Sequence, residues 1–163
     1  MEEYLLEMTV NGEKIRSKVQ PEQSLLKFLR AKGFTEVKCG CEKGDCGICT
    51  VLMNGETIKS CITLALQANG KEILTAKSLE KTEIGRKLQE SFVAHGAIQC
   101  GFCTTGMLMA AKEYLDKKQV PDKDEIRKAI SGILCRCTGY KKIIEAIYDV
   151  AETYYQMEGD NHV

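Results

Sequence analysis

Two hydrophobic periods divide the chain, one near two residues and the other near 3.6. In the first half, alternating segments flank Asn11-Gly12 and again Asn54-Gly55, dipeptides that are typical of two-residue hairpin turns. Between these hairpins the apolar positions of residues 25–29 suit one short helix. The pattern therefore predicts a small mixed sheet packed on a helix. The predicted strands are residues 4–10, 13–19, 50–53, 56–59 and 72–74.

From about Ser78 the helical period takes over and predicts four more helices. We expect Thr104 or Thr105 to cap the second of them, and Asp122 with Glu125 to form a capping box at the third. Their apolar positions are Ile84, Leu88 and Phe92; Met107, Leu108, Ala111, Tyr114 and Leu115; Ile126, Ala129 and Ile130; and Ile143, Ile147, Val150, Ala151 and Tyr154.

Strands followed by helices predict an α+β fold. We expect two small domains, a sheet domain over residues 1–76 and a helical domain over residues 77–163. Four helices with short connections favour a compact bundle in the second domain.

Charge excludes several classes of function. Lysine plus arginine equals aspartate plus glutamate at 23 each, and neither sign forms a long block, so nothing favours nucleic acid or an anionic membrane as a partner. No run of 18 apolar residues occurs, and neither a Walker A pattern nor G-x-G-x-x-G is present. Nine cysteines without an apolar signal segment predict thiolate ligands in a reducing compartment, which we expect to be the cytoplasm.

Four cysteines of the first half have the spacing of plant-type [2Fe–2S] ligands. Gly40, Gly44 and Gly47 stand among them, and glycine allows a loop to turn its N–H groups toward sulfur. Structural zinc is the alternative, although zinc sites usually take two close pairs of ligands rather than three ligands from one loop. The four are Cys41, Cys46, Cys49 and Cys61.

The second half carries another four cysteines as C-x2-C and C-x-C, each pair at the end of a predicted helix. Unpaired N–H groups and the positive end of a helix dipole favour an anionic cluster there. Taken alone, this spacing fits zinc as well as iron, but the plant-type loop in the same chain favours iron. The four are Cys100, Cys103, Cys135 and Cys137.

Residues 99–107, QCGFCTTGM, and 135–140, CRCTGY, resemble the small iron–sulfur subunit of molybdenum hydroxylases, the relatives of xanthine dehydrogenase, aldehyde oxidoreductase and aerobic carbon monoxide dehydrogenase. The resemblance implies a plant-ferredoxin-like β-grasp domain followed by a four-helix bundle. It assigns the first four cysteines to an outer cluster and the second four to an inner one.

By the same resemblance, Gln99 and the backbone at Cys137 approach the pterin of a molybdenum cofactor on a large partner subunit. The resemblance also implies a medium FAD subunit that receives electrons from the outer cluster. Arg136 could pair with a phosphate or carboxylate of the partner, or form an ion pair within its own chain.

The sequence departs from the family pattern at three positions. The family usually has Pro where Thr105 stands and Asn where Ile133 stands. Cys39 is an additional cysteine, since that position is not a ligand in the pattern. These changes concern the tuning of the sites rather than the ligands themselves.

These features predict an electron-transfer subunit of an oxidoreductase, which passes single electrons from a molybdenum–pterin centre through two [2Fe–2S] clusters towards FAD or another acceptor. The alternative is a free two-cluster ferredoxin, and a zinc-stabilised interaction module is a third reading. The chain has no acid–base pair of its own, so no catalytic residue is assigned and we expect the isolated subunit to hydroxylate nothing. The substrate belongs to the partner, with a purine or related N-heterocycle favoured.

Overall fold

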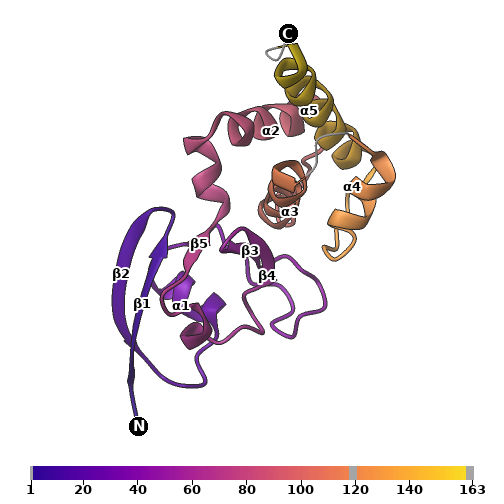
Figure 1. The fold of residues 1–163 in the computed structure, drawn as a ribbon. Helices are drawn as coiled ribbons and strands as arrows, with labels where there is room; N and C mark the ends of the chain where they lie inside the picture. Colours follow the sequence, from indigo (N-terminus) through magenta and orange to yellow (C-terminus); the bar gives the residue numbers. More distant parts are fainter. Residues whose placement is uncertain (1, 118–120, 161–163) are drawn as a thin grey trace.

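The computed structural model describes residues 2–117 and 121–160, with the side chains of the last helix as far as Tyr154. The strands lie at one end of the molecule and the long helices at the other (Figure 1). This arrangement confirms the α+β class. The elements are β1 (Tyr4–Val10), β2 (Glu13–Val19), α1 (Leu25–Ala31), β3 (Thr50–Met53), β4 (Glu56–Lys59), the 3-10 helix η1 (Ala65–Ala68), β5 (Glu72–Leu74), the 3-10 helix η2 (Ala76–Lys81), α2 (Glu83–Ala94), α3 (Thr104–Lys117), α4 (Lys123–Ile130) and α5 (Lys141–Asp160).

The five described strands form one sheet in the order β2-β1-β5-β3-β4. Both predicted hairpins are present, and their turns place Asn11 and Asn54 in the left-handed region with φ of 53° and 51°. Strand β5 runs parallel to β1 and antiparallel to β3, and so joins the two hairpins. Alternation along the strands turns Leu6 and Val10 of β1 into a core shared with Leu29 of α1.

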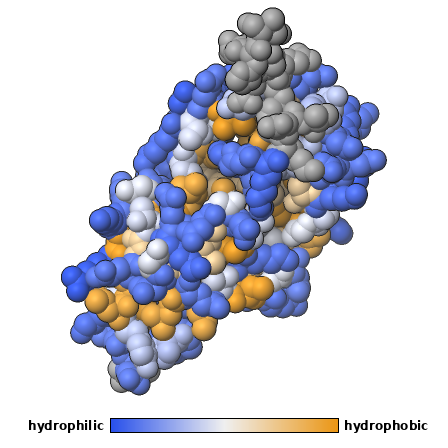
Figure 2. All heavy atoms as spheres, viewed as in Figure 1, coloured by the Kyte–Doolittle hydropathy of each residue, from blue (hydrophilic) through white to orange (hydrophobic). Residues whose placement is uncertain are grey.

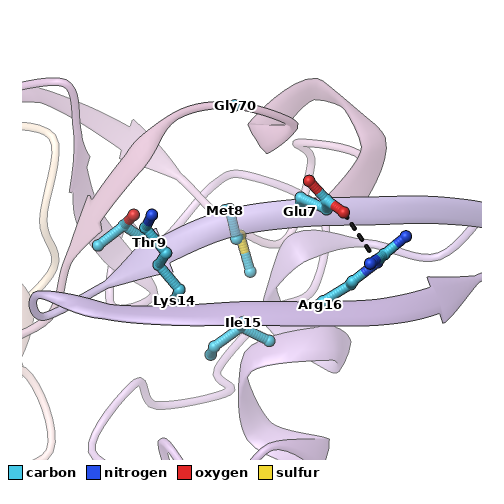
Figure 3. A pocket seen from close by; sticks show the side chains of 7 residues that line it. All are labelled: Glu7, Met8, Thr9, Lys14, Ile15, Arg16 and Gly70. Atoms are coloured by element: carbon cyan, nitrogen blue, oxygen red, sulfur yellow. Dashed lines mark ion pairs between the residues drawn. The ribbon is translucent and has the colours of Figure 1, made fainter.

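A shallow pocket of about 420 Å³ lies against the first hairpin. Figure 3 shows the Glu7 carboxylate of β1 reaching the Arg16 guanidinium of β2, with an Nε–Oε1 distance of 2.8 Å. Its lining includes no cysteine, so this pocket is separate from the residues that the sequence singles out. The lining residues are Glu7, Met8, Thr9, Lys14, Ile15, Arg16 and Gly70.

Helices α2 to α5 bury a second core, in which Phe92, Met107, Ile126 and Ile147 are completely or almost completely shielded from solvent. Helix α3 lies between the other helices and the sheet (Figure 1), and Leu52 of β3 belongs to the helical core rather than to the sheet core. The two halves therefore share a packed boundary. None of the described helices combines the length and apolar content needed to cross a membrane.

The structure agrees with the cap predicted for α4 but not with the one predicted for α3. Asp122 caps α4, since its carboxylate accepts from the N–H groups of Asp124 and Glu125. The N–H of Asp122 donates to the Tyr114 hydroxyl at 3.1 Å, so the second hydrogen bond of the predicted capping box goes to Tyr114 rather than to Glu125. The cap predicted for α3 is wrong, because Thr104 and Thr105 are already its first helical residues. The Cys103 carbonyl accepts from Met107 at 3.0 Å, which makes that cysteine the residue preceding the first turn.

One carboxylate of α3 supports the edge of the sheet. Glu113 accepts from the N–H of Thr57 in the edge strand β4 at 3.2 Å, and it pairs with Lys117 at 2.6 Å. Although burial alone would raise the pKa of Glu113, these donors outweigh it and hold that pKa below its usual value. An ionised carboxylate thus satisfies an edge N–H and ties α3 to the sheet.

Replacing Glu113 with Gln should lower the free energy of unfolding of the cluster-loaded chain at pH 7 by about 1 kcal/mol, since a charged acceptor becomes neutral. The difference should stay constant between about pH 6 and 9, because a carboxyl with a lowered pKa loses its stabilisation only as the pH falls from its unfolded pKa through its folded one. Thermal melts measure both. The matched control is Glu83→Gln, because Glu83 forms a more exposed i,i+4 pair with Lys87 and should matter little.

Candidate metal centres

The first cysteine loop connects α1 to β3 and depends on residues that can turn sharply. Gly44 and Gly47 adopt left-handed conformations with φ of 86° and 66°, as does Glu42 at 57°. A Cβ atom on Gly40 would lie 2.8 Å from Cys46 Sγ, so any larger residue there would have to displace that sulfur. The glycines singled out in the sequence therefore shape the space around the thiols.

The thiols of this first quartet lie close to one another. The N–H of Cys46 donates to Cys41 Sγ at 3.4 Å, and N–H donors from Cys46 and then Lys43 lower the pKa of Cys41 to about 6. Burial, followed by a hydrogen bond with Cys49, raises the pKa of Cys61 to about 12. The structure thus brings Cys61, which follows β4, back to the loop that carries the other three.

The second quartet forms where the start of α3 meets the loop between α4 and α5. The Cys137 thiol donates to Cys100 Sγ at 3.7 Å, and this hydrogen bond raises the pKa of Cys137. Burial, followed by a hydrogen bond with Cys135, raises the pKa of Cys103 to about 12. The four thiols are therefore gathered as two close pairs, one exposed and one largely buried.

Polar groups of the same loop surround Cys135. Thr138 places its hydroxyl 3.0 Å from Cys135 Sγ and donates its N–H at 3.4 Å. Burial, the largest single influence, would raise the pKa of Cys135, but these donors outweigh it and lower that pKa. The Tyr140 hydroxyl accepts from the N–H of Cys135 at 2.9 Å and donates to the carbonyl of Ile133 at 3.3 Å. The loop is thus fixed from both sides.

The donor chemistry of both quartets fits [2Fe–2S] clusters. Each quartet offers four thiols, and the glycines and N–H donors around them are of the kind that accommodate and stabilise sulfur. Among the described residues, no group of three or more His, Cys, Asp or Glu side chains is arranged around one point as the ligands of a single metal ion. The thiols lie in pairs instead, and two thiolates per iron is the ligand arrangement of a two-iron cluster.

The two cysteine loops touch each other directly. The Cys46 carbonyl accepts from the N–H of Leu134 at 2.9 Å, and Leu134 is bonded to Cys135. A Cβ atom on Gly47 would lie 2.0 Å from the carbonyl oxygen of Gly132, so the backbones meet at a distance that only glycine allows. Sequence reasoning missed this contact, because no spacing pattern links two loops about 85 residues apart.

The first turn of α3 also packs closely against the first cysteine loop. A Cβ atom on Gly106 would lie 3.1 Å from the carbonyl oxygens of both Gly47 and Ile48. The N-terminal end of α3 thus reaches the first cysteine loop as well as carrying Cys103 of the second quartet.

Gln99 and Cys137, the two residues assigned to the pterin by resemblance, are neighbours. The Gln99 amide Nε2 donates to the Cys137 carbonyl at 3.2 Å, and both residues are exposed. Three large apolar side chains of the neighbouring segments are also exposed: Ile98 at 37%, Phe102 at 44% and Leu134 at 56%. One side of the second quartet therefore reaches the protein surface.

Hydrophobic patches alternate with hydrophilic ones on the face seen in Figure 2.

The three departures from the family pattern have different surroundings. The Cys39 thiol donates to Glu42 Oε1 at 3.2 Å, and this hydrogen bond raises the pKa of Cys39. Ile133 is buried in the helical core. The Thr105 hydroxyl is shielded from solvent and lacks a hydrogen-bond partner among the described residues.

Comparison with known families matches both halves of the chain. A "2Fe-2S iron-sulfur cluster binding domain" covers residues 8–78, and a "[2Fe-2S] binding domain" covers residues 75–148. Together these families span both quartets.

Two curated relatives match over most of their own length. The nicotine 6-hydroxylase small subunit of Paenarthrobacter nicotinovorans is 45% identical over 88% of this chain and 87% of its own. The xanthine dehydrogenase iron-sulfur-binding subunit of Escherichia coli O157:H7 is 40% identical over 93% and 97%.

Among solved structures, quinoline 2-oxidoreductase from Pseudomonas putida 86 superposes with a TM-score of 0.88 and 45% identity, covering 96% of this chain and 98% of the matched one. The aldehyde oxidoreductase of Desulfovibrio desulfuricans gives 0.86 and 34%, but there the match covers 93% of this chain and only 17% of the other. In that protein the same unit is part of a much longer chain.

Replacing Gly47 with Ala should separate the two cysteine loops. Because the added Cβ overlaps the Gly132 carbonyl, we expect the free energy of unfolding to fall by at least about 2 kcal/mol more than in Gly55→Ala. Gly55 has a similar positive φ, and a methyl group added there would meet nothing within 4 Å, so this control carries the backbone strain without the overlap. Thermal melts and iron content per chain measure the outcome. Equal losses in both variants would contradict the role given to the contact.

Proposed function

This chain belongs to the family of iron–sulfur small subunits of molybdenum hydroxylases, and from that premise we propose which residues carry its function. It is an electron-transfer subunit of an oxidoreductase complex and binds two [2Fe–2S] clusters. When bound, each cluster supplies one-electron chemistry, which divides the two electrons of a hydroxylation into single transfers.

We assign the outer cluster to Cys41, Cys46, Cys49 and Cys61, and the inner cluster to Cys100, Cys103, Cys135 and Cys137. The contacts between thiols suggest how each quartet divides between two irons. In the outer quartet Cys41 neighbours Cys46 and Cys49 neighbours Cys61. In the inner quartet Cys100 neighbours Cys137 and Cys103 neighbours Cys135.

The observation that carries the proposal is the hydrogen bond between the two cysteine loops. The Cys46 carbonyl and the Leu134 N–H connect an outer ligand to the residue bonded to an inner ligand. A backbone route of covalent bonds and one hydrogen bond therefore joins Cys46 of the first site to Cys135 of the second. Because both loops are fixed by packing, the chain reorganises little when its charge changes.

The exposed side of the inner quartet is the side we assign to a large molybdenum-cofactor subunit. Gln99 and the Cys137 backbone would contact its pterin, as the resemblance implies. Exposed Phe102 and Leu134 beside them favour a permanent partner over a free ferredoxin carrier, because such apolar side chains are typical of a covered surface. A medium FAD subunit would meet the outer cluster.

The substrate of the complex is best placed among N-heterocycles. Relatives at 40–45% identity are named for nicotine, nicotinate, xanthine and caffeine, and the quinoline enzyme provides a similar solved structure. Specificity would reside in the large subunit, so this chain alone should hydroxylate nothing. Nine cysteines as free thiols and ligands suit the reducing cytoplasm.

We also propose the finer division of the fold. Residues 1–76 would form a β-grasp unit, in which the five-stranded mixed sheet packs on α1. Residues 77–163 would form a four-helix bundle from α2, α3, α4 and α5 around their common core.

Iron and acid-labile sulfide analysis with EPR tests the assignment. The anaerobically purified, reduced chain should contain about four of each and give two distinct signals, since each of two clusters holds two irons and two sulfides. Cys61→Ser should weaken only the outer signal, and Cys137→Ser only the inner one. Cys39→Ser is the matched control and should retain both. Zinc in place of iron, or full retention of both signals in either ligand variant, would contradict the assignment.

A further inference from the structure

Arg136 is an exposed arginine between two ligands of the inner quartet, Cys135 and Cys137. Its sequence position left open an ion pair within the chain or one with a partner. Among the residues that the structure describes, no carboxylate forms a salt bridge with Arg136, although nine other ion pairs are found there. The intrachain alternative therefore has no support.

The segment around Arg136 is basic throughout. Residues 126–144 contain five Lys and Arg side chains and no Asp or Glu. Most of the others already have local roles: Arg127 pairs with Asp124, and Lys141 lies 3.9 Å from Glu145. The five are Arg127, Lys128, Arg136, Lys141 and Lys142.

Lys142 and Lys128 both lie near the C-terminal end of a helix. Lys142 Nζ lies beside the C-terminal end of α2, 3.3 Å from the position that a Cβ atom on Gly96 would occupy. Lys128 is in the last turn of α4, where a cation is favourable to the helix dipole. Within the described part of the chain, Arg136 is thus left as the cation of this segment without a role in its own fold.

Two exposed apolar side chains belong to the segments that carry Arg136 and the cysteines of the inner quartet. Leu134, two residues earlier, and Phe102, next to the ligand Cys103, are both more than two-fifths exposed. An arginine beside exposed apolar groups is the composition of an interface centre, since guanidinium is weakly hydrated and apolar neighbours exclude water once covered. The guanidinium fork binds a planar carboxylate through two parallel hydrogen bonds.

Building on the function proposed above, we propose that Arg136 anchors the molybdenum subunit by pairing with a carboxylate of that subunit's protein surface. Leu134 and Phe102 would cover the pair and exclude water. The partner surface is therefore expected to be apolar with an acidic residue at its centre. A pair enclosed in this way slows dissociation more than it speeds association.

The test measures binding of the cluster-loaded chain to the immobilised large subunit. Arg136→Ala should weaken binding at least about thirty-fold, chiefly through faster dissociation, as expected for an interface hot spot. Arg136→Lys should recover only part of the loss, because the charge returns without the fork. The matched control is Arg16→Ala, which removes an exposed arginine of the distant hairpin and should stay within about two-fold of the unmodified chain. Iron content and EPR confirm that each variant is loaded, and Arg136→Gln replaces the Ala variant if that one is not.

Repeating the measurement with large subunit lacking its cofactor identifies the partner group. A loss of the same size without the cofactor supports a protein carboxylate. A loss that disappears without it would overturn this assignment in favour of a cofactor phosphate. Arg136→Ala binding as well as Arg16→Ala would overturn the anchor itself. If the unmodified chain binds no molybdenum subunit, the proposed function fails first, and the inference fails with it.

Discussion

The close approach of two cysteine loops is the contact on which the rest of the structure depends. Gly47 and Gly132 let their backbones meet at a distance that no side chain allows, and the Cys46 carbonyl then reaches the Leu134 N–H. Helix α3 completes the contact through Gly106. A sheet unit and a helical unit are thereby held in one fixed relation. This matters for electron transfer, because the transfer rate depends on the distance between the two centres. A fixed distance keeps that rate constant.

The pKa values of the thiols differ within each quartet because the fold places donors beside some thiols and buries others. Each quartet contains one cysteine whose pKa is lowered by N–H and hydroxyl donors, Cys41 in one and Cys135 in the other. Each also contains one whose pKa is raised to about 12 by burial and neighbouring thiols, Cys61 and Cys103. Because ligands must be deprotonated, loading iron releases protons and relieves the crowding of thiols. Cofactor binding and folding are therefore coupled.

The surroundings of the inner quartet differ from those of the outer cysteine loop. In the segments that carry the inner quartet, Cys100 and Cys137 are exposed, and so are Phe102, Leu134 and Arg136. The outer loop instead carries charges of both signs, including a pair between Lys43 and Asp45. Such an asymmetry suits a subunit whose inner side is covered in the complex and whose outer side meets a second component.

The sequence by itself determined the class of the fold, the limits of the strands and the two sets of cysteines, because these follow from hydrophobic period, turn dipeptides and ligand spacing. Asn11-Gly12 and the spacing of Cys41, Cys46 and Cys49 are local signals of this kind. Only the tertiary structure decided that the backbones of Gly47 and Gly132 meet and that the Leu134 N–H donates to the Cys46 carbonyl. It also decided that Arg136 forms no salt bridge with a carboxylate among the described residues. The two loop contacts join segments about 90 residues apart, so they arise from packing between units and produce no periodic pattern in the sequence. The cap of α3 was also decided by the structure, in which Cys103, rather than a threonine, precedes the first turn.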